Sequence, residues 1–237
     1  MLRDLPAAGC LAPVPVLIPD LPGYGERQNV PPDEVSVESA AACVREEMRA
    51  AGFEKAHIVG HSVGGAVAVL LAHRYPEVVA SLIDVEGNFT LKDAFWSGQM
   101  ARMSVPEVQA VLDGYRADVD GWLRRGGIEP TEARVAIARR GFDELPAGTI
   151  RAMARSVVEV TAEPAYLDYV REILDRGTTL QLLAGERSRA GWDVPAFVES
   201  RAAGMSIQPG VGHMMMLEDA PGFLRIIAGL VAASRAA

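Results

Sequence analysis

One stretch constrains the fold more than any other, residues 58–67, which read IVGHSVGGAV. Ser62 stands there between glycines, directly after an apolar run and directly before another. The first run, residues 55–60, predicts a buried strand, and residues 66–75, apolar nearly all round, predict a buried helix. Glycines two positions before and after the serine leave room for a very tight turn. The pattern therefore predicts a strand, a strained turn and a helix, with the Ser62 hydroxyl exposed at the end of a sheet.

The flanking segments extend this alternation of strand and helix. Further strands are predicted at residues 14–20, 79–85, 178–183 and 205–208, and further helices at 35–51, 195–203 and 223–231. This rhythm is typical of a parallel sheet with covering helices. Between residues 89 and 176 no good strand appears, and helix-like segments follow one another at 91–103, 106–124, 131–140, 149–160 and 166–176. We therefore expect an α/β core from residues 1–88 and 177–237, and a helical cap from residues 89–176.

Composition limits the function classes. The 237 residues suit one domain with an insertion. A net charge of −8 argues against nucleic acid as a partner. The start, Met1–Asp4, lacks the pattern of a secretory signal, and the longest apolar run, residues 63–72, is too short for a bilayer, so we expect a cytoplasmic protein with no membrane partner. The two isolated cysteines, Cys10 and Cys43, predict idle thiols rather than a disulfide.

A serine hydroxyl is a weak nucleophile at neutral pH and needs a base within hydrogen-bond reach. Of the four histidines, His57 lies inside a predicted strand, His61 inside the turn, and His73 near the end of a helix, where a cation suits the helix dipole. His213 alone follows a strand and a glycine-rich loop and precedes the final helix. We predict that His213 is the base and that His61 is structural support.

At this point the chain resembles the α/β-hydrolase fold. The matching pieces are PDLPGYG at residues 19–25, the turn GHSVGG at 60–65, and GVGH at 210–213 with Glu218 and Pro221 after it. The resemblance covers nearly the whole chain, and the helical insertion stands where that family carries a cap. The family's order of nucleophile, acid and histidine assigns the first and last roles to Ser62 and His213.

The acid is less certain from this resemblance. Many relatives place an Asp in the turn after the strand that follows the cap, and here that turn, GERS at residues 185–188, has Ser188 instead. Some members, including one branch of the haloalkane dehalogenases, carry the acid at the end of the strand after the elbow helix. That strand ends with Asp84 and Glu86, which a regular strand places on one face. We favour Glu86, which lies nearest the loop surface. The open alternatives for the acid are Asp84, Glu186 and Asp193. A purely structural alternative is that Glu86 only caps the insertion.

Because the elbow holds a serine, acyl transfer is the expected reaction class, with the backbone N–H of Val63 as one oxyanion donor. The family's second donor comes from an early His-Gly loop, and no His-Gly precedes Ser62. We therefore also expect the first strands of the family to be missing. We expect a truncated form of an ordinary hydrolase, and the alternative is a reduced member that catalyses poorly.

The expected substrate is a small molecule, an ester, thioester or related carbonyl compound with a medium-sized apolar group. Two apolar sets could enclose it: Phe89, Phe95, Trp96, Met100 and Met103 in the cap, and Met214–Leu217 after the base. The structural alternative, that these residues fill the cap's own core, stays equally open. No cofactor and no metal are expected, and the oligomeric state is left open. The alternative functions are a non-catalytic ligand-binding protein and an acyltransferase or lyase on the same scaffold.

Overall fold

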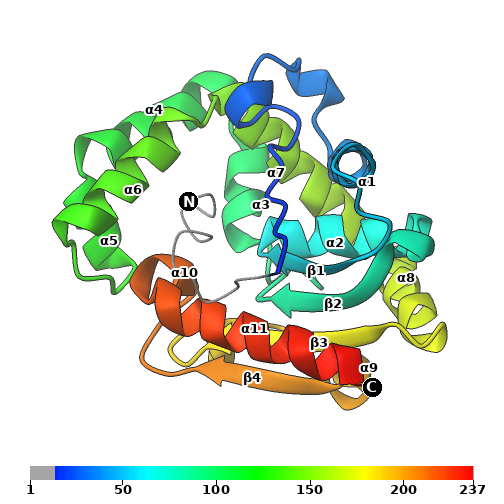
Figure 1. The fold of residues 1–237 in the computed structure, drawn as a ribbon. Helices are drawn as coiled ribbons and strands as arrows, with labels where there is room; N and C mark the ends of the chain where they lie inside the picture. The colour runs from blue at the N-terminus through cyan, green and yellow to red at the C-terminus, as the bar shows by residue number, and fades with distance from the viewer. Residues whose placement is uncertain (1–13, 237) are drawn as a thin grey trace.

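The computed structural model describes residues 14–236. In this part of the chain four parallel strands form one sheet in the order β1-β2-β3-β4 (Figure 1). The strands are β1 (Ala56–His61), β2 (Val79–Val85), β3 (Thr179–Gly185) and β4 (Gly204–Gln208). Four predicted strands and the predicted parallel α/β architecture are therefore confirmed. Because order in the sheet follows order in the chain, successive strands end side by side at one edge.

Helices cover both faces of this sheet. On one face lie α1 (Val37–Ala50), α2 (Val63–Arg74), α8 (Pro164–Asp175) and α9 (Ala196–Arg201). On the other lie the short α10 (Met215–Glu218) and the long α11 (Ala220–Ala236), which Figure 1 shows running along the strands. The insertion supplies α3 (Phe95–Arg102), α4 (Val105–Ala117), α5 (Val119–Arg125), α6 (Glu132–Asp143) and α7 (Ala147–Ala162).

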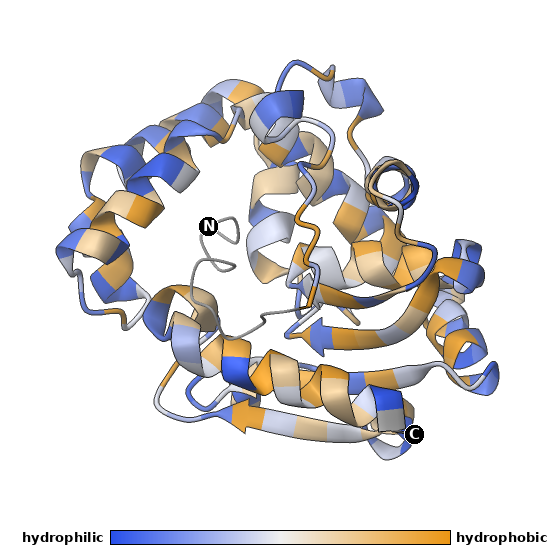
Figure 2. Cartoon of the chain, viewed as in Figure 1, coloured by the Kyte–Doolittle hydropathy of each residue, from blue (hydrophilic) through white to orange (hydrophobic). Residues whose placement is uncertain are grey.

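Side-chain alternation along the strands explains the two-sided core. Leu82 on β2 and Leu180 and Leu182 on β3 belong to the cluster that packs with α2, whereas Ile83 and Leu183 pack with α11. This is the period of two expected for a sheet that is buried on both faces. Figure 2 shows hydrophobic residues along the strands and the helices beside them.

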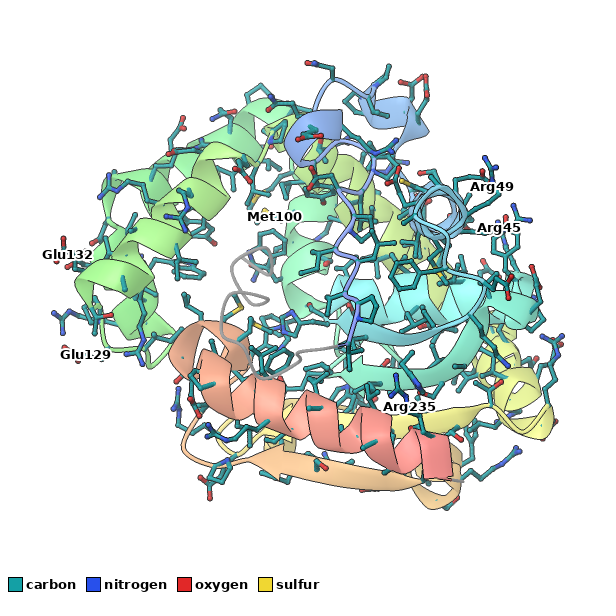
Figure 3. The ribbon with its side chains drawn as sticks, viewed as in Figure 1. Arg45, Arg49, Met100, Glu129, Glu132 and Arg235 are labelled. Atoms are coloured by element: carbon teal, nitrogen blue, oxygen red, sulfur yellow. The ribbon has the colours of Figure 1, made fainter. Side chains whose placement is uncertain are left out.

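Helices α3 to α6 form an arch beside the sheet (Figure 1). They pack in two clusters, one shared with α7 around Met100 and Leu112 and one shared with α10 around Leu123 and Phe142. Figure 3 shows Met100 on the inner side of the arch, with Glu129 and Glu132 at its outer side. Helix α8 and part of α7 instead join the cluster that covers the sheet. The division into core and cap at residues 89 and 176 stays a prediction.

Two predicted elements are wrong in detail. Residues 14–20 form no strand, because Pro15 and Pro19 lack the N–H groups that a ladder needs. The predicted helix 106–124 is two helices, α4 and α5, because the side chain of Asp118 accepts the backbone N–H of Gly121 and so caps α5. The expectations on Met1–Asp4, on Cys10 and on missing first strands concern residues that lie outside the described part. Within residues 14–236, no helix combines the length and hydropathy that crossing a membrane requires.

Candidate active site

The turn between β1 and α2 holds Ser62 in an unusual backbone conformation. Its φ is 54° and its ψ is −123°, a region that costs free energy for a residue with a Cβ. The neighbouring strand fixes this conformation, since Ser62 donates its N–H to Val85 O at 3.1 Å and accepts that of Asn88 at 3.3 Å. The predicted strand–turn–helix unit is thus present, with Ser62 at the N-terminus of a twelve-residue helix.

Position 65 of the motif needs a glycine because two backbones meet there. A Cβ on Gly65 would lie 2.6 Å from Cα of Gly87 and 2.9 Å from a carboxylate oxygen of Asp84. The elbow therefore touches the end of β2 directly. Val63 opens α2, so its backbone N–H has no acceptor within the helix and is available to an oxyanion.

Glu86 follows β2 and is also held in a left-handed conformation, with φ of 45°. The residue is buried, and its carboxylate accepts three hydrogen bonds. Oε1 accepts the backbone N–H of Gly185 at 2.9 Å and the hydroxyl of Ser188 at 2.5 Å, and Oε2 lies 2.6 Å from Nδ1 of His213. An ionised carboxylate only accepts hydrogen bonds, so Nδ1 of His213 carries the proton and Nε2 is left as the basic nitrogen.

His213 lies in the loop after β4, and its side chain is 45% exposed. His61, the residue before Ser62, contacts it in two ways. The Nε2–H of His61 donates to the His213 carbonyl at 2.9 Å, and the two rings lie 4.5 Å apart between centroids. His61 therefore connects the elbow to the loop that carries His213, a contact that the prediction of structural support did not specify.

The electrostatics of the site follow from burial and these contacts. Burial works to raise the pKa of Glu86, but hydrogen bonds from His213, Ser188 and Gly185 outweigh it and lower the pKa below its ordinary value. Burial lowers the pKa of His61 to about 3, so this ring is neutral near neutral pH. His213 therefore lies between a neutral donor, His61, and an ionised carboxylate, Glu86. This is a suitable environment for a general base.

One polar residue of the candidate site follows each of the four strands. Ser62 follows β1, Glu86 follows β2, Ser188 follows β3 and His213 follows β4. In open parallel sheets, ligands bind at the carboxyl ends of the strands. The sequence prediction included three of these residues, and it noted Ser188 only as a departure from the family.

The other candidate acids lie elsewhere. Asp84 accepts the N–H of Gly87 at 2.7 Å beneath the elbow, Glu186 accepts that of Gly210, and Asp193 pairs with Thr90 and Lys92. Sequence alternation placed Asp84 and Glu86 on one face. The positive φ of Glu86 ends the strand geometry, and this separates the two side chains.

The remaining histidines and the cysteine have structural partners. Nδ1 of His57 pairs with the hydroxyl of Ser81 at 2.8 Å, and His73 stacks on Tyr169 and lies 3.1 Å from Glu172. Burial raises the pKa of the Cys43 thiol, which disfavours a nucleophilic thiolate. Among residues 14–236, no three His, Cys, Asp or Glu side chains gather as metal ligands.

The apolar residues predicted for a pocket are divided in the structure. Phe89 is buried and stacks on Trp192 with ring centroids 5.9 Å apart, and Met100 is buried in the arch. Met215 and Met216 fill the core under α11, whereas Phe95 is 75% exposed. All four are buried, but only Met100 packs in the cap, as the alternative to a pocket expects, whereas Phe89, Met215 and Met216 belong to the clusters beside the sheet.

One contact of the predicted triad is missing. Between the described residues, no hydrogen bond joins the Ser62 hydroxyl to the His213 ring, although each lies beside His61. Catalytic hydrogen bonds are often long in unliganded enzymes and tighten when substrate binds.

Comparison with known proteins bears on the fold of the chain. A family profile described as alpha/beta hydrolase fold matches residues 11–124. The chain is 41% identical over 68 residues to 2-hydroxy-6-oxo-6-phenylhexa-2,4-dienoate hydrolase of Burkholderia cepacia, a match that covers 29% of this chain and only 24% of that relative. It is 28% identical over 229 residues to 2-hydroxy-6-oxo-2,4-heptadienoate hydrolase of Pseudomonas putida, covering 92% of this chain and 78% of the relative.

A solved structure extends the match to the fold. The thermophilic esterase from Thermogutta terrifontis superposes with a TM-score of 0.66 at 18% identity, covering 98% of this chain and 86% of the esterase. The parallel sheet, the serine elbow after β1 and the profile match point to the same conclusion. The chain therefore has the fold of the α/β hydrolases.

Proposed function

We propose that the protein is a serine hydrolase in which Ser62 is the nucleophile, His213 the base and Glu86 the acid. The observation that carries the proposal is the 2.6 Å hydrogen bond between Glu86 and Nδ1 of His213, formed beside a strained serine elbow. This bond fixes the tautomer of the imidazole, so that Nε2 is free to accept a proton.

The mechanism follows from these roles. Ser62 Oγ attacks a substrate carbonyl while Nε2 of His213 takes its proton, and Glu86 stabilises the resulting imidazolium. The oxyanion accepts the N–H of Val63 at the positive end of α2, an interaction worth about 3 kcal/mol in comparable sites. The protonated His213 then gives its proton to the leaving group. Water next attacks the acyl carbonyl while His213 takes its proton, and His213 returns that proton to Ser62 Oγ as the carboxylic acid leaves.

The substrate class is a carbonyl compound with a medium-sized apolar group. The two relatives are named for 2-hydroxy-6-oxo-dienoates, which carry a ketone carbonyl, and the structural neighbour is an esterase. Both groups offer an electrophilic carbon to a serine. Ester, thioester and ketone substrates therefore belong to the same proposal, and a cytoplasmic location and a small-molecule substrate remain part of it.

The test uses a fluorophosphonate, which phosphonylates activated serines irreversibly. We expect labelling of Ser62, located by peptide mass spectrometry, together with hydrolysis of p-nitrophenyl butyrate. Ser62→Ala removes both, because no nucleophile is left. Folded wild-type protein that neither reacts with the probe nor turns over the ester would contradict the proposal.

A second candidate is a non-catalytic ligand-binding protein. The missing hydrogen bond between Ser62 and His213 favours it. In that case binding of an apolar carboxylate ester, measured by calorimetry, would be equal in wild type and Ser62→Ala and no product would form. An acyltransferase or lyase would instead label at Ser62, and only analysis of its products separates it from a hydrolase.

A further inference from the structure

The hydroxyl of Ser188 has a defined direction. Its oxygen lies 2.5 Å from Oε1 of Glu86 and 3.4 Å from the carbonyl of Gly185. A hydroxyl has one proton, and a short bond to an ionised carboxylate is stronger than a long one to a carbonyl. Ser188 therefore donates to Glu86 across 102 residues of sequence, from the turn that follows β3.

We propose that Ser188 is a positioning residue, which holds the Glu86 carboxylate so that its other oxygen meets the base. The inference rests on the proposed function, in which Glu86 is the acid. In this proposal, the turn after β3 does not supply the acid. It instead orients Glu86, which follows β2.

Glu86 needs such support because its side chain has three rotatable torsions, so the position of its backbone alone does not fix the carboxylate. Ser188 and the N–H of Gly185 both bind Oε1, and Gly185 ends a central strand. With Oε1 held at two points, Oε2 is the oxygen left for His213.

The rest of the same turn holds the loop of the base. Glu186 accepts the N–H of Gly210 at 2.7 Å, and Arg187 donates to the carbonyl of Gly210 and pairs with Glu218 at 2.7 Å. The turn thus contacts both the acid and the loop that carries His213. Ser188 itself forms no hydrogen bond with His213, so its effect passes through Glu86.

The role predicts a specific pH effect. The titratable groups that act on Glu86 are His213, from the loop after β4, and His61, from the end of β1. Removing the Ser188 hydroxyl removes one of the bonds that lower the pKa of Glu86 and leaves the burial that raises it. Glu86 then takes up a proton at a higher pH, so the acid limb of the activity profile moves upward.

The experiment compares Ser188→Ala, Ser188→Thr and Ser200→Ala. Ser200 is an exposed serine near the end of α9 whose hydroxyl bonds Phe197 O, so its variant is a matched loss of one hydroxyl away from the site. We expect Ser188→Ala to lower kcat for p-nitrophenyl butyrate about tenfold, with KM within twofold, and to shift the acid limb upward. We expect Ser188→Thr, which keeps the hydroxyl, and Ser200→Ala to stay within threefold of wild type.

An unchanged kcat and acid limb in Ser188→Ala would overturn the proposal. An equal loss in the Ala and Thr variants, with an unmoved acid limb, would also overturn it, because it would indicate an effect of packing alone.

Nitrogen NMR of the His213 ring reports on its hydrogen bond to Glu86 without catalysis. We expect faster exchange of the Nδ1 proton in Ser188→Ala. If wild type lacks activity, the proposed function fails, and this exchange rate alone decides the role of Ser188, with an unchanged rate counting against it.

Discussion

At the scale of single residues, Glu86 differs from the other carboxylates by what its two oxygens contact. One oxygen is held by Gly185 and Ser188, and the other meets His213. Glu86→Gln keeps the shape of the side chain but removes the charge that, in the proposed mechanism, stabilises the imidazolium. We expect kcat to fall by on the order of a thousandfold, as neutral replacements of triad acids do. The measurement is ester hydrolysis with purified protein, and retention of more than a tenth of the activity would remove Glu86 from the acid role.

Asp193→Asn is the control for this variant. Asp193 was an alternative acid, but it binds Thr90 and Lys92 and not His213. We expect its activity to stay within threefold of wild type. The sequence alone left four carboxylates open because strand alternation says nothing about a residue that leaves the strand. The positive φ of Glu86, which non-glycine residues seldom adopt, decided the orientation and carries no sequence signal.

At the scale of elements, the contact between the elbow and the end of β2 explains why a glycine stands at position 65 in the first turn of α2. A Cβ at Gly65 would lie 2.6 Å from Cα of Gly87, whereas a Cβ at Gly64 meets nothing within 4 Å. We expect Gly65→Ala to lower the free energy of unfolding by about 2 kcal/mol, since backbone must move to admit the methyl group. We expect Gly64→Ala, one residue away in the same helix, to be neutral or to stabilise by up to about 1 kcal/mol.

Urea denaturation of both variants checks this difference, and equal unfolding free energies would show that the turn does not depend on the close approach.

The same elements show how much of the fold could be predicted from the sequence. Apolar periodicity located four strands and most helices, since burial on both faces produces a strong pattern. It failed at residues 14–20, where an apolar run lacks the donors for pairing, and at Asp118, where a single side-chain cap divides a continuous helical pattern.

At the scale of the whole molecule, two ionisable groups near the site, the buried Asp84 and the half-buried His61, give opposite pH dependence to stability. Burial raises the pKa of Asp84 from 3.8 to about 7, so the unfolded chain loses this proton first and stability falls as pH rises between these values. Burial lowers the pKa of His61 from 6.5 to about 3, so the unfolded chain gains a proton first and stability falls as pH drops between these values. Between about pH 4 and 6.5 the two contributions largely cancel.

Asp84→Asn separates them. The amide oxygen can still accept the N–H of Gly87, and the variant has no group at this position that titrates. We expect the free energy of unfolding of Asp84→Asn, relative to wild type, to increase by about 4 kcal/mol from pH 4 to pH 7.5, because only wild type must ionise a buried carboxyl. Any constant cost of placing the amide shifts the whole curve without changing this slope. Urea denaturation at several pH values gives both curves, and parallel curves would show that Asp84 ionises in the folded protein as readily as in the unfolded chain.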